Sequence, residues 1–201
     1  MKISGARLLL IATLSACLVP LASGCTGKSP YMTPASRSGI EAAQDSATVV
    51  FVRPSQYGGA DRIIITDGKG RFLGETMPST YFATKVPAGD HIFLSLGETT
   101  SAIKASLVAG KVYYVEAYGP TGAGTPRLEL RAVTLKSPEW GKIDGWLASA
   151  NALATDEPAG QAYLQEHPSR VEGAVSHGNE AIAEYTSHEL SEHTLTAEDG
   201  R

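Results

Sequence analysis

The sequence predicts a mainly β fold: an antiparallel, immunoglobulin-like β-sandwich followed by a C-terminal α-helical appendage. Residues 47–135 contain about eight short runs of β-branched and alternating apolar residues, about 8–12 residues apart and separated by Gly and Pro turns. Residues 136–195 change to apolar residues at helical spacing. A length of 201 residues with 42% hydrophobic content suits one globular domain with additions.

Each predicted strand is a short run bounded by turn residues. The Asp67-Gly68 pair is typical of a tight hairpin. His91 follows the turn at 87–90, and we expect it to cap that turn and pack its ring on a neighbouring strand. Tyr113 and Tyr114 should point to opposite faces, one into the core and one to the surface. The predicted strands are residues 48–52, 62–66, 71–75, 80–86, 91–96, 101–108, 112–118 and 127–132.

The helical region is expected to begin at Ser137 and Pro138, as an N-cap and a first helical residue. A second, short helix is expected over residues 156–166. Ser169 and Glu172 are expected to form a capping box before a last helix that runs to about His193. Residues 196–201 are expected to be disordered. The first helix is predicted from the 3,4 spacing of Trp140, Ile143, Leu147, Ala150 and Ala154.

The N-terminal residues 1–24 have the order of a secretory signal peptide: two basic residues, an apolar run, then small residues. Cys25 follows the small residues directly, which is typical of a bacterial lipoprotein signal. Cys25 is therefore the predicted lipid attachment site, and Cys17 is the rival. Residues 25–46 are rich in Ser, Thr, Gly, Ala and Pro and are predicted to be a flexible tether.

Composition excludes several classes of function. The two cysteines both lie in the signal region, so a disulfide framework, a cysteine-ligated zinc site and a thiol nucleophile are excluded downstream. A net charge of −4 argues against nucleic acid as a partner. Beyond the signal, the sequence contains no apolar run long enough to predict a second membrane span.

Five ordered motifs within residues 47–135 resemble a bacterial lipoprotein family catalogued as domain of unknown function 2846. Its members typically carry a lipoprotein signal upstream. The turn at 87–91 is also similar to that of PEGA-type surface-layer domains. The resemblance implies a small β-sandwich at the cell envelope and implies no chemistry. The matching motifs are residues 50–55, 73–75, 81–82, 86–91 and 109–115.

One group of side chains on the predicted last helix could in principle hold a divalent metal ion: His177, Glu184 and His188. These residues flank the apolar stripe without an HExxH motif, so a solvated polar surface is the favoured interpretation. No cofactor is predicted, because the glycine-rich residues 119–125 precede a strand and lack the Lys-Ser/Thr of a phosphate loop. A tyrosine patch for glycan or peptide binding is a weaker expectation; it would use Tyr57, Tyr81, Tyr118 and the outward member of the 113/114 pair.

We therefore expect a protein of the bacterial envelope, lipid-anchored and facing the periplasm from the outer membrane. Its expected role is non-enzymatic binding or assembly, with an envelope protein or a cell-wall component as partner. The alternative is a metal-dependent envelope hydrolase that uses His177, Glu184 and His188.

Overall fold

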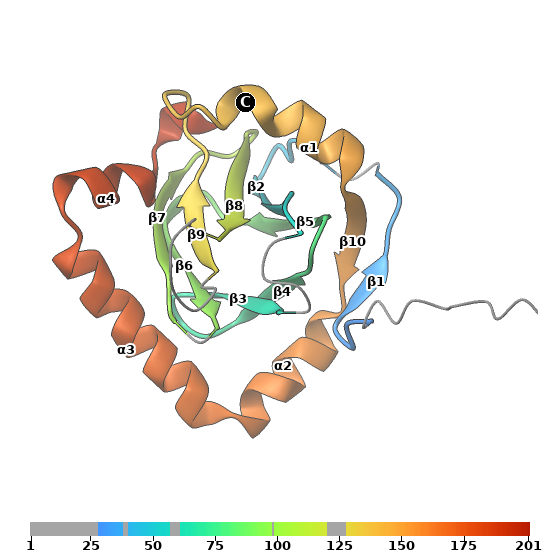
Figure 1. Ribbon diagram of the computed structural model, residues 1–201, viewed down its shortest axis with the longest axis vertical. Coiled ribbons are helices and arrows are strands. Elements are labelled where there is room, and N and C mark those ends of the chain that lie inside the picture. Colours follow the sequence, from blue (N-terminus) through green and yellow to red (C-terminus); the bar gives the residue numbers. More distant parts are fainter. Residues whose placement is uncertain (1–27, 38–39, 57–60, 98, 120–127) are drawn as a thin grey trace, which may run out of the picture.

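Two β-sheets packed face to face form the centre of the molecule, and helices lie outside them (Figure 1). The computed structural model describes residues 28–37, 40–56, 61–97, 99–119 and 128–201. Sheet A has the strand order β1-β10-β5-β2-β8-β9, and sheet B has the order β11-β7-β6-β3-β4. The chain is thus mainly β and sandwich-like, as predicted.

The eight predicted strands are confirmed with small changes at their ends. Alternating or continuous apolar runs form them because each strand buries at least one surface. They are β2 (Ala47–Arg53), β3 (Ile63–Asp67), β4 (Phe72–Thr76), β5 (Thr80–Val86), β6 (Gly89–Leu96), β7 (Ala102–Leu107), β8 (Val112–Tyr118) and β9 (Glu129–Ala132). Three further strands are β1 (Met32–Pro34), β10 (Asn151–Thr155) and β11 (Thr194–Leu195).

Helices cover the outer surface of both sheets. On sheet A, η1 (Trp140–Lys142) and α1 (Ile143–Ser149) pack against outward residues such as Val50 and Val52 of β2. On sheet B, α2 (Glu157–Glu166) and α3 (Pro168–Glu184) pack against Phe72 and Leu94. All seven residues of β2 are therefore buried, with Val49 and Phe51 in the core between the sheets.

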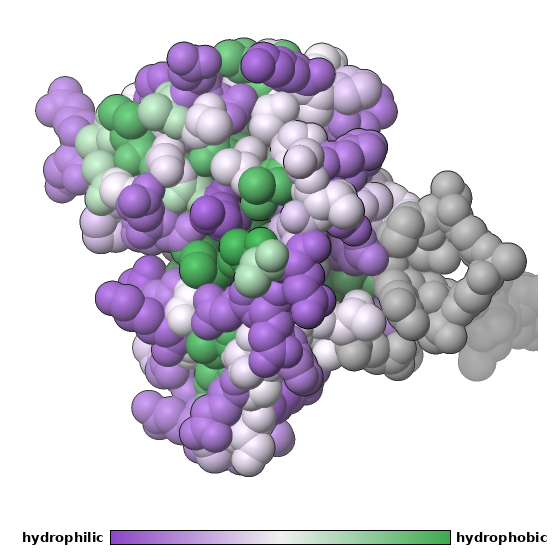
Figure 2. Space-filling model, turned by 90° about the vertical axis from the view of Figure 1, so that its left-hand side faces the viewer, coloured by the Kyte–Doolittle hydropathy of each residue, from purple (hydrophilic) through white to green (hydrophobic). Residues whose placement is uncertain are grey.

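Two glycines allow the helices to lie directly on sheet B. A Cβ at Gly160 of α2 would lie 2.3 Å from the Phe72 ring, and one at Gly178 of α3 would lie 2.3 Å from a Leu94 methyl group. Both distances are shorter than real Cβ contacts, so a side chain at either position would force the Phe72 ring or the Leu94 methyl group to shift. The opposite surface of α3, with α4 (Ser187–Glu192), is mostly hydrophilic, and apolar residues appear there as separate patches (Figure 2).

The expectation of an antiparallel immunoglobulin-like sandwich is wrong in its strand pairing. Both sheets are mixed: β2 pairs in parallel with β8, β5 with β10, and β7 with β11. Two of these pairs arise because the C-terminal region contributes a strand to each sheet. The predicted separate appendage at 136–195 is therefore interleaved with the sandwich.

The C-terminal elements also differ from prediction. The first helix ends at Ser149, because residues 151–153 leave the helix and pair with β5. The predicted last helix divides into α3 and α4 at Tyr185, where Thr186 and Glu189 form a capping box. The tail 196–201 is ordered: η2 (Ala197–Asp199) follows β11, and Arg201 exchanges backbone hydrogen bonds with Val112 at 2.8 and 3.1 Å.

Part of the predicted flexible tether is an ordered element of the folded domain. Within residues 25–46, β1 pairs antiparallel with β10, so Met32 is buried in the core. Ile40 packs against the helix-covered surface of sheet A. Apolar burial outweighs the loop-like composition of this segment.

Candidate functional site

A groove of about 490 Å³ opens beside β5, where β10 departs from it. β10 pairs with β5 only from Thr80 to Phe82. It then crosses toward sheet B, where the Thr155 Oγ1 donates a hydrogen bond of 3.0 Å to the Leu73 carbonyl. Among the described residues, none pairs with residues 83–86 on the side away from β2. We call this opening the β5 groove.

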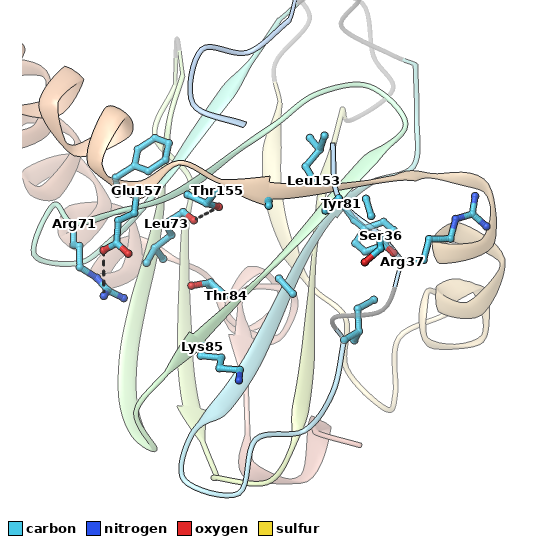
Figure 3. A pocket seen from close by; sticks show the side chains of 16 residues that line it. Ser36, Arg37, Arg71, Leu73, Tyr81, Thr84, Lys85, Leu153, Thr155 and Glu157 are labelled. Atoms are coloured by element: carbon cyan, nitrogen blue, oxygen red, sulfur yellow. Dashed lines mark hydrogen bonds and ion pairs between the residues drawn. The ribbon is translucent and has the colours of Figure 1, made fainter. Parts of the chain in front are cut away.

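The lining of the β5 groove combines charged and polar side chains with a few apolar ones (Figure 3). Leu73 and Leu153, which belong to or pack against the core between the sheets, line its interior. Arg71 and Arg37 lie at opposite ends of the view, with Lys85 below β10 between them. Segments from four distant parts of the chain thus meet at one opening.

The charges at the rim are unevenly paired. Arg71 forms ion pairs of 3.6 Å with both Asp67 and Glu157. Arg37 and Lys85 take part in no ion pair among the described residues. The rim therefore carries two cations available to a carboxylate.

Tyr81 places a hydroxyl group in the same lining. Burial raises the pKa of Tyr81, and the positive charge of Arg37 opposes that rise. The phenol is therefore protonated at neutral pH and can donate a hydrogen bond.

Backbone groups add a second kind of recognition. In an antiparallel pair, alternate residues direct their N–H and C=O groups away from the partner strand. Along residues 83–86 these groups face the β5 groove and can pair with an added extended chain. The site therefore combines strand-like hydrogen bonding with a basic rim and a partly apolar lining.

A second charged cluster lies on β8 and β9 of sheet A. An Arg131 Nη2 lies 2.6 Å from a Glu116 carboxylate oxygen and 3.3 Å from Glu139. Burial raises the pKa of Glu116, while the hydrogen bond and charge of Arg131 lower it. The guanidinium also lies 4.3 Å from the Tyr118 ring centre, and burial, followed by the charge of Glu129, raises the pKa of Tyr118 to about 12. This cluster satisfies its own charges and ties β9 to η1.

The structure does not bring the predicted metal ligands together. His177 and Glu184 lie on α3, whereas His188 lies on α4 beyond the break at Tyr185. Within the described part of the chain, no group of three His, Cys, Asp or Glu side chains could hold a metal ion. The helix break separates residues that a continuous helix would have aligned.

The other sequence expectations have mixed outcomes. The His91 Nε2–H donates a hydrogen bond of 2.8 Å to the Pro87 carbonyl, so its turn-capping role is confirmed. Its ring stacks on Phe93 of the same strand, β6, and not on a neighbouring strand as expected. Tyr113 and Tyr114 are both buried, because helices cover the surface that was expected to face solvent. The tyrosine patch is therefore not formed as predicted.

Several predicted features lie outside the described residues: the signal peptide 1–24, Cys17, Cys25, Tyr57 and most of the loop 119–125. No helix in the described ranges is long and apolar enough to cross a membrane.

Sequence reasoning missed the β5 groove, although it predicted β5 itself. The groove exists only because β10 pairs with part of β5, and residues 151–155 were expected to be helical. The available signal was Asp156, which caps α2 by accepting a hydrogen bond from the Ala159 N–H at 3.1 Å and so marks a helix start directly after this segment.

Comparisons with protein-family models, curated proteins and solved structures found no significant match for this chain. The resemblance to the bacterial lipoprotein family thus stays a prediction.

Proposed function

We propose that this protein is a lipid-anchored binding module of the bacterial envelope that holds an extended, carboxylate-bearing polypeptide segment in the β5 groove. The attachment site is Cys25, and the module faces the periplasm from the outer membrane. The role is binding, without a catalysed reaction. The observation that carries the proposal is the open edge of β5 beneath a basic rim.

The chemistry of the β5 groove favours an acidic, extended ligand. Residues 83–86 offer backbone groups for strand addition. A lysine on an exposed edge discourages pairing with other strands. Lys85 therefore disfavours the binding of neutral and basic segments. A carboxylate opposite Lys85 neutralises the lysine charge and accepts a charge-assisted hydrogen bond from it.

The anchor is supported by the order of residues in the first 25 positions. Labelling with a radioactive or clickable lipid precursor tests it in a bacterial host. We expect Cys25→Ser to abolish labelling and to release the protein from membranes, while Cys17→Ser retains both. Unchanged labelling of Cys25→Ser would overturn the assignment, and loss in Cys17→Ser alone would move the anchor to the rival position.

Site-specific photo-crosslinking tests the groove. A crosslinking amino acid at Thr84, in the lining, is compared with one at the exposed Glu198. We expect position 84 to yield one defined adduct in native envelopes, with its crosslinked peptide containing Asp or Glu. Lys85→Glu should remove the adduct, whereas Lys104→Glu, which makes the same charge change at an exposed position of β7, should keep it.

Three results would contradict the proposal: equal adducts at both positions, an adduct indifferent to Lys85→Glu, or an adduct to a cell-wall glycan instead of a peptide.

A further inference from the structure

The segment that follows the predicted anchor is fixed to the folded body from its first described residues. The Tyr31 N–H donates to the Ser29 Oγ at 3.0 Å, and the Asp156 N–H donates to the Tyr31 carbonyl at 2.8 Å. Ser29 is buried, and β1 begins at Met32. Residues 29–34 are therefore part of the domain and do not act as a spacer.

Side chains of this segment hold it on sheet B and α2. The Tyr31 ring lies 5.7 Å from Phe72 and 5.3 Å from Tyr163 between ring centres. The backbone N–H of Glu75 donates to the Met32 sulfur at 3.3 Å. Pulling the segment away would expose these rings and a buried methionine, which opposes detachment.

The short connection limits how far the domain can lie from a lipid at Cys25. Four residue steps separate Cys25 from the buried Ser29. A fully extended chain covers at most about 3.5 Å per step, so the attachment point lies within about 14 Å of Ser29. The diameter of a small domain is about 30 Å, so only one side of the molecule can meet the bilayer.

We infer that the surface around Lys28, Arg62 and the C-terminal turn of α2 rests on phospholipid headgroups. This inference depends on the lipid anchor of the proposed function. An Arg62 Nη donates to the Lys28 carbonyl at 3.1 Å, so the two basic residues lie together. Their positive charges can pair with headgroup phosphates. Tyr163 and Glu166 of α2 lie on the same side of the molecule, near Tyr31.

The inference fixes the orientation of the rest of the domain. In Figure 1 the chain leaves β1 beside α2, whereas α1 and the C-terminus lie at the opposite end of the molecule. Lys136 is exposed. It lies near the C-terminus, because the backbone N–H of the neighbouring Leu135 donates to Asp199 at 3.0 Å. The α1 end therefore points away from the bilayer.

Fluorescence quenching by nitroxide-headgroup lipids tests this orientation. The mature chain has Cys25 as its only cysteine, and its thiol is used for lipid attachment, so an introduced cysteine can be labelled uniquely. Lipidated full-length protein carrying Glu166→Cys or Lys136→Cys is placed in phosphatidylethanolamine–phosphatidylglycerol vesicles. We expect several-fold stronger quenching at position 166 than at 136.

A longer connection supplies the matched control. A Gly/Ser insertion of about ten residues between Gly27 and Lys28 should keep the protein on vesicles and abolish the difference between the labels. Equal quenching at positions 166 and 136 in the chain without the insertion would overturn the orientation. An anchor at Cys17, with its longer connection, is expected to give this same result. Protein that does not float with vesicles would instead overturn the anchor itself, so the two failures are distinguishable.

Discussion

The charged side chains beside two strands of sheet A, β9 and β5, differ in their ion pairing. At β9, Arg131 lies between Glu116 and Glu139, at 2.6 and 3.3 Å. At β5, residues 83–86 have no strand partner on the side away from β2 among the described residues, and Lys85 takes part in no ion pair there. Unpaired strand edges invite association with other chains. The comparison teaches that the charges beside β9 satisfy each other, while the charge beside the unpaired part of β5 is available to a ligand.

The largest expected effect comes from breaking the charge cluster beside β9. Arg131→Met leaves Glu116 buried without its partner, and breaking a buried ion pair in this way costs about 3 kcal/mol of unfolding free energy. Urea unfolding of the purified protein measures the loss. The double variant with Glu116→Gln should recover part of it, and a single variant as stable as wild type would contradict a structural role for the cluster.

A smaller, pH-dependent effect is expected from Glu116 itself. Its pKa is raised in the folded protein, chiefly by burial, so the folded state binds the proton more tightly than the unfolded chain. The contribution of Glu116 to stability is therefore present below the unfolded pKa of about 4.3 and is lost as pH rises through the raised value. We expect the unfolding free energy of wild type relative to Glu116→Gln to fall over this range; a rise with pH would contradict the sign.

The smallest expected effect on stability lies at the open edge. Lys85→Glu and Lys104→Glu should each change the unfolding free energy by no more than about 0.5 kcal/mol, because both side chains are exposed. Thermal unfolding of the two variants measures this directly. A large loss of unfolding free energy in Lys85→Glu alone would show that Lys85 stabilises the fold. The difference between β9 and β5 would then disappear.

The sandwich strands were predictable because their signals are local. Alternation over residues 102–107 or the continuous apolar run of β2 can be read within the strand itself. The break before α4 was also readable, since Thr186 and Glu189 stand three apart as a capping box. Tyr31 and Met32 were a sequence signal that the segment of β1 belongs to the folded domain, because they are two large side chains within a loop-like composition.

The remaining features depend on contacts distant in sequence. Residues 151–155 continue the helical spacing of α1, yet they form a strand because the edge of β5, about 70 positions earlier, is free to pair. The β5 groove follows from the same event, since it lies where that pairing stops. Neither the pairing nor its end can be derived from local propensity.

Amide hydrogen exchange along β5 tests the central claim most directly. The full-length protein is measured both purified and in native membranes, with Lys85→Glu as the variant and Lys104→Glu as its control. We predict that, within residues 83–86, the amides directed away from β2 exchange fast in the purified protein and slow down in native membranes, and that Lys85→Glu alone abolishes the slowing. Identical exchange of these amides in both preparations would contradict a segment bound at the open edge.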